Sequence, residues 1–492
     1  MFGRWSGAGG YREVLKVGLP LVVSLGSASV MQFTDRMFLS HYSLDAIAAS
    51  TPAFVVQFLF VAFFLGTSEY VNVFVAQYTG AGAHHRVGAA LWQGLWFCLP
   101  SGVLLALAGL LGGPIFAWAG HPPRVQELEA VYFGILCLGG GPSLLQMTVL
   151  SFFSGRGLTM PVMVVNVLAA AVNIPLDYAL INGVWIFPEW GIAGAAWATV
   201  AAWVFGAALA VWLVFRREYE ADFHVFSAWR FDRDLFARLL RFGAPGGVQF
   251  LLDVFAFSTF TFFVGRLGTD ALAATNIVIA LDTLAFLPMV GLSVSASVLV
   301  GQAIGAGRPE QGARATWNTL HLAMLWMGSI GLCFLVLPGP LLDIFHPLGM
   351  SPQEFAPIRE AGVVLLRFAA AFSLLDAMTM VLFSALKNAG DTRFVMLAMG
   401  TASLSVMVLP LYLLVVVLDA GLYAAWACLL SYITVLSVVF LLRFRQGKWR
   451  GMRVVEAGPP TTATVAPPAT GGAIPTVDAS IPPAPDPQGH DD

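Results

Sequence analysis

The sequence predicts an all-α polytopic membrane protein, whose twelve transmembrane helices form two six-helix bundles related by a parallel pseudo-twofold repeat. Three observations lead to this fold class. Hydrophobic residues make up 58% of the 492 residues and charged residues only 11%, whereas a soluble domain carries about 25% charged residues. Apolar segments long enough to cross about 30 Å of hydrocarbon recur along the chain. Finally, residues 15–92 align without a gap to residues 240–317.

The predicted elements are twelve apolar segments. Each is predicted to be a helix, because a helix satisfies its backbone hydrogen bonds internally and can therefore lie in lipid. Their approximate limits are 15–39, 46–76, 88–118, 128–153, 161–182, 191–215, 236–265, 270–301, 314–342, 358–386, 394–418 and 421–443.

The internal repeat relates positions 225 residues apart and has 21 identities in 78 aligned positions, among them Gln77 and Gln302. One repeat contains six helices, an even number, so both copies cross the membrane in the same sense and are related by an axis along the membrane normal. We therefore expect an N-terminal bundle over residues 15–215 and a C-terminal bundle over residues 236–443. Between them lies a charged linker over residues 216–235, and the bundles enclose a cavity at their interface.

Lysine and arginine predict the orientation. With the N-terminus inside, 20 of the 25 Lys and Arg residues fall on the cytoplasmic side, as the positive-inside rule requires. We expect a multi-pass protein of the cell (inner) membrane with residues 1–14 and 444–492 in the cytoplasm. Residues 444–492 are predicted to form a disordered tail, because most of this stretch, residues 455–492, is rich in Pro, Ala and Thr and lacks periodicity.

Composition and motifs argue against several other classes of protein. The net charge of −3 provides no basic field for nucleic acid. The four cysteines are scattered singly, without the spacing of a metal or redox site. The glycine-rich ends of two helices lack the Lys-Ser/Thr of a phosphate-binding loop. We expect no enzyme activity, no cofactor, and no nucleic-acid or nucleotide partner.

Several motifs, in this order and spacing, resemble those of the MATE (multidrug and toxic compound extrusion) family and its bacterial NorM and DinF-like branches. They are VAQYTGAG at 75–82, NIPLDY at 173–178, GIAGAAWAT at 191–199, VGQAIGAG at 300–307 and FSLLDAMTMVLFSALKNAGDTR at 372–393. The resemblance covers nearly all of residues 12–445. It implies a monomeric antiporter that exports small organic, cationic and amphipathic compounds in exchange for Na⁺ or H⁺, by rocking-bundle alternating access.

Acidic residues inside the spans are candidates for ion coupling, because an acid at the centre of a spanning helix costs about 2.5–3.5 kcal/mol on insertion scales. Asp253 and Asp376 match the acidic pair of the family's C-terminal bundle, which belongs to a cation site in the NorM-like branch. Two carboxylates in one pocket favour a bound cation or a shared proton. The family often has Glu where this chain has Asp253. Alternatively, Ser258 or Thr379 satisfies a buried acid.

Asp35, late in the first span, matches the family's helix 1 acid, which binds protons or Na⁺. Alternatively, Asp35 and its neighbour Arg36 snorkel together at the outer interface.

Asn173 and Asp177 lie on one helix face because they are four residues apart, and Pro175 between them loosens the helix. In the DinF-like branch these positions join the helix 1 acid, and Thr199 is a further candidate ligand. Alternatively, Asp177 reaches interfacial water. A bound Na⁺ is therefore expected either at Asp253 and Asp376 or at Asp35 and Asp177.

Glu69 and Asp282 are less typical of the family. Either they face the cavity and attract cationic substrate, or Ser68 and Thr283 satisfy them structurally.

Three alternative functions stay open. A lipid-intermediate flippase of a related fold would need an Arg-rich central groove, and the spans carry almost no Arg. A membrane-embedded enzyme would need a catalytic histidine with a partner, and His321 has none evident in the sequence. A passive channel would not need paired buried acids.

Overall fold

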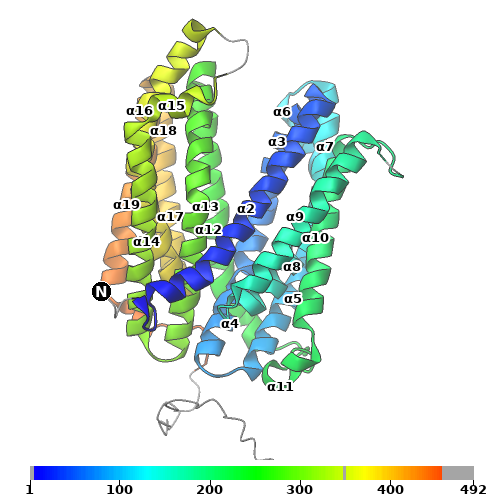
Figure 1. Cartoon of the computed structure of the whole chain (residues 1–492), viewed down its shortest axis with the longest axis vertical. Helices are drawn as coiled ribbons and strands as arrows, with labels where there is room; N and C mark the ends of the chain where they lie inside the picture. Colours follow the sequence, from blue (N-terminus) through cyan, green and yellow to red (C-terminus); the bar gives the residue numbers. More distant parts are fainter. Residues whose placement is uncertain (1–4, 185, 347–350, 457–492) are drawn as a thin grey trace, which may run out of the picture. The chain divides into compact units, whose positions relative to one another are not determined.

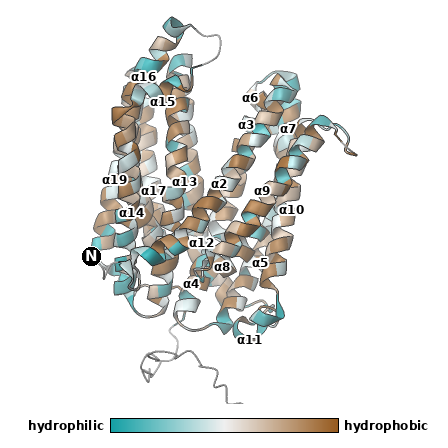
Figure 2. Ribbon diagram, in the orientation of Figure 1, coloured by the Kyte–Doolittle hydropathy of each residue, from teal (hydrophilic) through white to brown (hydrophobic). Residues whose placement is uncertain are grey.

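The computed structural model describes residues 5–184, 186–346 and 351–456, and the regular structure in these ranges is helical throughout. Twelve helical segments in them are long and apolar enough to cross a membrane, which confirms the predicted number. Figure 1 shows the first six spans, blue to teal, in one bundle and the last six, green to orange, in a second. In Figure 2, hydrophobic residues cover the middle of the helices and hydrophilic residues gather at their ends.

The first bundle contains α2 (Tyr11–Tyr42), α3 (Leu44–Ser68) with α4 (Tyr70–Gly80), α5 (His85–Ala108) with η1 (Gly109–Leu111) and α6 (Gly112–Ala119), α7 (Pro123–Leu138) with α8 (Gly140–Ser154), α9 (Thr159–Asn182) and α10 (Ile192–Val214). The segment expected as a linker contains η2 (Arg217–Tyr219) and α11 (Glu220–Phe223).

The second bundle contains α12 (Arg233–Gly265), α13 (Thr269–Gly305), α14 (Pro309–Val336) followed by α15 (Pro338–Asp343), and α16 (Pro352–Ala389). Its eleventh span runs through α17 (Thr392–Ala402), η3 (Ser403–Val408), α18 (Leu409–Tyr412) and η4 (Leu413–Val417), and its last is α19 (Gly421–Arg445), followed by η5 (Lys448–Gly451).

Four spans depart from a regular α-helix, one of them the third, which contains the 3₁₀ turn η1. The second breaks at Glu69, between α3 and α4, and the fourth breaks at Gly139, between α7 and α8. The eleventh becomes a π-helix on both sides of the turn that holds Pro410, where the proline ring removes a backbone donor. The interruption at Glu69 is slight, since this residue keeps right-handed helical dihedral angles (φ −54°, ψ −25°), and its charged side chain lies between the bundles.

Two pairs of repeat-related residues bring the bundles together. A Cβ atom at Gly80, the last residue of α4, would overlap the carbonyl oxygen of Gln302 in α13. A Cβ atom at Gly305, the last residue of α13, would overlap the carbonyl oxygen of Gln77 in α4. Because only glycine lacks a Cβ atom, these two positions permit the close approach of the bundles.

The same two glutamines join the bundles by hydrogen bonds. Nε2 of Gln77 donates to the carbonyl oxygen of Asn388 at 2.9 Å, and Nε2 of Gln302 donates to the carbonyl oxygen of Gly155 at 2.9 Å. These contacts lie near the face of the protein at which α2 begins and α19 ends, called the terminal face below. We call this contact zone between the bundles the seam.

The structure corrects the predicted extent of the disordered tail. Residues 446–456, called the strap below, pack against the bundles, and Trp449 and Val454 are buried. The backbone N–H of Val454 donates to Oε1 of Gln77 at 2.9 Å. The tail was predicted to begin at residue 444 because its composition hides these tertiary contacts; its remainder, residues 457–492, lies outside the described residues.

Glu456, the last residue of the strap, is surrounded by three hydrogen-bond donors. Its carboxylate accepts hydrogen bonds from Tyr78 at 2.7 Å, from Arg86 at 2.9 Å and from Arg238. Partial burial alone would raise the pKa of Glu456, but the hydrogen bonds and the arginine charges outweigh it and lower the pKa to about 2. The strap therefore connects α19 to helices of both bundles at the terminal face.

Candidate functional site

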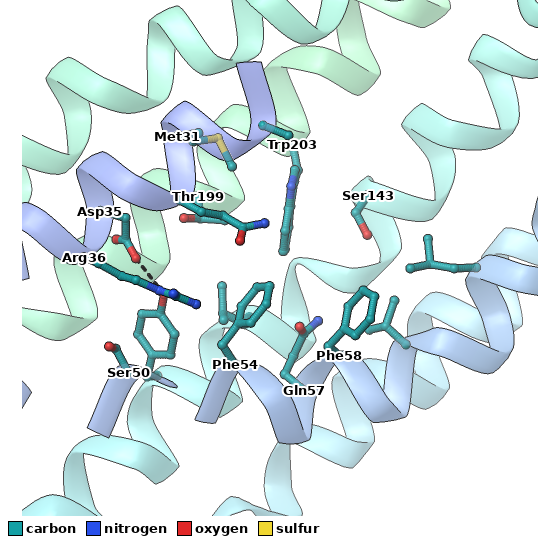
Figure 3. Close-up of a pocket in the computed structure, with 16 residues that line it drawn as sticks. Met31, Asp35, Arg36, Ser50, Phe54, Gln57, Phe58, Ser143, Thr199 and Trp203 are labelled. Carbon is teal, nitrogen blue, oxygen red and sulfur yellow. Dashed lines mark hydrogen bonds between the residues drawn. The ribbon is translucent and has the colours of Figure 1, made fainter. Parts of the chain in front are cut away.

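A cavity of about 260 Å³ lies inside the first bundle, between α2, α3, α7, α8 and α10. Figure 3 shows the labelled side chains of α2, α3, α8 and α10 around it. Its aromatic lining residues are Phe54, Phe58, Tyr132 and Trp203, and its polar ones are Gln32, Asp35, Arg36, Ser50, Gln57, Ser143 and Thr199. The space therefore combines aromatic walls with a single carboxylate.

Asp35 of α2 lies on the cavity wall and is only 8% exposed. Its Oδ2 atom accepts a hydrogen bond from the hydroxyl of Tyr132 in α7 at 3.2 Å, drawn in Figure 3. Its Oδ1 atom is buried and has no hydrogen-bond partner. The hydrogen-bond partner of Asp35 is therefore Tyr132, and the neighbouring Arg36 interacts with its carboxylate electrostatically.

Asn173 and Asp177 of α9 are fully buried, and neither side chain has a hydrogen-bond partner for its polar atoms. The carboxylates of Asp177 and Asp35 interact electrostatically, and Tyr132 interacts with both. Full burial excludes the alternative that Asp177 reaches interfacial water. Thr199 of α10 lines the cavity near this group and is 7% exposed.

The structure thus brings the predicted residues of the first bundle together and adds Tyr132. Two buried carboxylates with unpartnered oxygen atoms are costly when both are ionised. A proton or a small cation relieves that cost, since oxygen atoms of carboxylates and amides bind hard cations. Sequence reasoning missed Tyr132 because a tyrosine in an apolar run is usually a packing residue.

In the second bundle, Asp253 of α12 and Asp282 of α13 both interact electrostatically with Asp376 of α16. Asp376 is 7% exposed. Tyr432 of α19 interacts with Asp253 and Asp376, and its buried hydroxyl has no hydrogen-bond partner. Sequence reasoning did not single out Tyr432, for the same reason as Tyr132.

The structural alternatives for these acids differ from those predicted. The hydroxyl of Thr379 bonds to the carbonyl oxygen of Leu375 and to Ser437, not to Asp376. Asp282 accepts a hydrogen bond from Ser373 at 2.7 Å, not from Thr283. Within residues 5–184, 186–346 and 351–456, no group of three or more His, Cys, Asp or Glu side chains is arranged to hold a metal ion.

Glu69 has a different partner from the predicted Ser68. Its carboxylate is 2.6 Å from Nζ of Lys387, at the end of α16 in the other bundle. The hydroxyl of Tyr70 also reaches α16, where it donates to the carbonyl oxygen of Lys387 at 3.0 Å. Glu69 therefore belongs to the seam and not to the cavity of the first bundle.

Comparison with known proteins extends over most of the chain. The family model MatE matches residues 20–179 and 245–413, and the second match begins 225 residues after the first, which is the offset of the internal repeat. A probable multidrug resistance protein NorM of Synechocystis sp. is 26% identical over 88% of this chain and 94% of the relative. The multidrug resistance protein NorM of Burkholderia vietnamiensis is 30% identical over 78% of this chain and 83% of the relative.

Solved structures agree with the fold. A multidrug resistance MATE family transporter of the MOP superfamily, in an outward-facing conformation, matches with a TM-score of 0.79 at 19% identity, over 89% of this chain and 95% of that chain. A MOP superfamily transporter from Pyrococcus furiosus matches with a TM-score of 0.80 at 19% identity, over 89% and 96%.

Proposed function

The chain belongs to the MatE family, and we propose that it is a secondary active antiporter that exports small organic, cationic and amphipathic compounds in exchange for Na⁺ or H⁺. The names of the relatives, multidrug resistance proteins, support the export of such compounds. We place the protein in the cell (inner) membrane as a monomer. The excess of Lys and Arg at the terminal face supports a cytoplasmic position for that face and both termini.

The observation that carries the proposal is the buried, incompletely bonded pair Asp35 and Asp177 beside an aromatic cavity. The two carboxylates need a counter-charge, and a cation or proton supplies it. The aromatic side chains, including Phe54, Phe58 and Trp203, suit an amphipathic ligand, because aromatic faces attract organic cations. The second group, around Asp253 and Asp376, supports a further ion site in the other bundle.

Antiport requires only that the ion and the substrate stabilise different conformations. In the conformation described here, the seam closes the terminal face. We propose that the ion reaches the buried acids from the side opposite the terminal face and that its binding lowers the affinity for substrate. Release of the ion to the cytoplasm then accompanies opening of the seam. A flippase for lipid-linked sugars is less well supported, because Arg36 is the one basic residue among those that line the cavity.

Proteoliposomes test the proposal. Purified protein is reconstituted, tetraphenylphosphonium is supplied outside, and a Na⁺ gradient or a pH gradient is imposed separately, with a dissipated-gradient control. We expect the gradient of the coupling ion to drive accumulation of tetraphenylphosphonium, and the double variant Asp35→Asn/Asp177→Asn to lose most of it. Antiport is contradicted if folded wild-type protein accumulates tetraphenylphosphonium equally with either gradient and in the dissipated-gradient control.

A further inference from the structure

An ion pair between Glu69 of the first bundle and Lys387 of the second joins the two bundles. Nζ of Lys387 lies 2.6 Å from the carboxylate, and the lysine side chain is 5% exposed while that of Glu69 is 42% exposed. Nζ of Lys387 also lies 5.5 Å from the ring centre of Phe383. The lysine is thus held in a buried place by one carboxylate, whereas the glutamate keeps access to its surroundings.

The internal repeat provides a comparison for this pair within the same molecule. The gapless alignment places Val294 at the position of Glu69. The segment SFFSGRGLT at 151–159 matches SALKNAGDT at 384–392, which places Ser154 at the position of Lys387. The hydrogen bonds of the two repeat-related glutamines show that the same helix ends meet on both sides of the seam. On the second side the positions equivalent to Glu69 and Lys387 hold an apolar and a small polar residue, so the same helix ends meet there without this ion pair.

An ion pair that buries a lysine is a poor way to stabilise a contact, because removing the ammonium group from water offsets much of its attraction to the carboxylate. Since the equivalent contact forms without this ion pair, Glu69 and Lys387 call for another explanation. The chemistry of the contact is that of an ammonium group bound to a carboxylate. A cationic substrate presents a positive centre of the same kind.

We propose that Glu69 is a recognition site for the cationic centre of the substrate, and that Lys387 occupies this site as a built-in substitute cation while the terminal face is closed. The inference rests on the proposed function and deepens it. Because Glu69 belongs to the first bundle and Lys387 to the second, any motion that parts the bundles at the seam separates the pair. Glu69 then faces the opened terminal side without a counter-charge, and a substrate cation restores one.

Substrate and Lys387 therefore exclude each other at Glu69. When the seam closes again, the lysine returns at a high effective concentration, because it is attached to the same chain. It displaces the substrate cation from Glu69 and prevents return to the terminal side. The pair lowers substrate affinity while the terminal face is closed, without any contact between Glu69 and the buried acids of the two bundles, and the ion gradient sets the direction of net transport.

The test is equilibrium binding of tetraphenylphosphonium to purified full-length protein at fixed pH. Lys387→Met removes the substitute cation and leaves Glu69 in a half-exposed position, so we expect binding about tenfold tighter than in the wild type, the size of one charge-assisted contact. The double variant Lys387→Met/Glu69→Gln should lose the whole gain. Lys387→Gln carries the same expectation and serves if the methionine variant aggregates.

A matched control separates release of Glu69 from a loosened seam. Gln302→Ala removes a hydrogen bond between the bundles but keeps the ion pair. Loosening the seam by about 1 kcal/mol can tighten binding by at most about fivefold, so we expect a smaller gain in affinity than in Lys387→Met. The inference is overturned if Lys387→Met binds no more tightly, or if tighter binding persists in the double variant. Failure of the wild type to accumulate tetraphenylphosphonium in proteoliposomes would instead defeat the proposed function, so the two failures are distinguishable.

Discussion

Gln77 and Gln302 occupy equivalent positions in the two repeats, and each donates its side-chain amide to a backbone carbonyl of the opposite bundle at 2.9 Å. The backbone carbonyl of Gln77 lies against Gly305, the last residue of α13, and that of Gln302 lies against Gly80, the last residue of α4. The pseudo-twofold relation of the sequence is therefore also the symmetry of the seam. Opening of the terminal face must break both hydrogen bonds.

Removal of either glutamine amide should loosen the seam. We expect Gln77→Ala and Gln302→Ala each to lower the free energy of seam closure by about 1 kcal/mol, the net value of one hydrogen bond. The measurement is the labelling rate of a cysteine introduced at Ser384, a residue of α16 near the seam, by a membrane-impermeant maleimide. Gln77→Ala should have the larger effect because Gln77 also accepts the N–H of Val454. Equal labelling in both variants and the wild type would contradict this account of the seam.

The acids of both bundles are expected to contribute to coupling. If the NorM-like pair dominates, Asp253→Asn/Asp376→Asn abolishes ion-driven accumulation in proteoliposomes. If Asp35→Asn alone abolishes it, the coupling site lies in the first bundle. We expect loss in both variants, because each bundle holds buried carboxylates in mutual electrostatic contact. Intact ion-driven export by the folded Asp253→Asn/Asp376→Asn variant would remove the second bundle from the mechanism.

Tyr132 should be needed to hold Asp35 in place. Tyr132→Phe keeps the ring, which is 3% exposed, but leaves both oxygen atoms of Asp35 without a hydrogen-bond partner. A buried acceptor that loses its donor costs about 1–3 kcal/mol, so we expect a lower midpoint of thermal unfolding. The double variant Tyr132→Phe/Asp35→Asn is the control, and its further loss should be small. Additive losses would show that the hydroxyl acts elsewhere.

Much of this architecture could be predicted from the sequence, because apolar length and the repeat are properties of local segments. The twelve spans, and the glycine turns at Gly82 and Gly307 with their left-handed backbone, are of this kind. The break at Glu69 was not predictable, since the apolar run continues through it. The contact between Tyr132 and Asp35 was not predictable either. The two residues are 97 positions apart in the sequence and meet only when α2 packs near α7.

The strap escaped prediction for the same reason. Its composition continues into a Pro-rich tail, and its partners lie far away in sequence: Glu456 is 378 residues from Tyr78 and 370 from Arg86. A pattern read along the chain shows no sign of these contacts. Only the folded arrangement of both bundles brings two arginines and a tyrosine to one carboxylate.

Docking of the strap should depend on acidity. The pKa of Glu456 is lowered from 4.5 to about 2, so its ionised form is favoured in the docked state. A lowered pKa contributes stability that is complete above about pH 4.5 and is lost as the pH falls toward about 2. We therefore expect hydrogen exchange at the N–H of Val454, followed by mass spectrometry, to show full protection at neutral pH and progressive loss of protection below pH 4.5.

Substitution at the strap separates this effect from general acid unfolding. Glu456→Gln should expose the Val454 N–H to exchange already at neutral pH and remove the strap's own pH dependence. Glu310→Gln is the matched control: Glu310 pairs with Arg450 at 3.2 Å on the protein surface, with side chains 73% and 47% exposed. Exposed pairs contribute little, so this variant should keep the wild-type protection. If both variants lose protection equally, the three donors around Glu456 do not hold the strap.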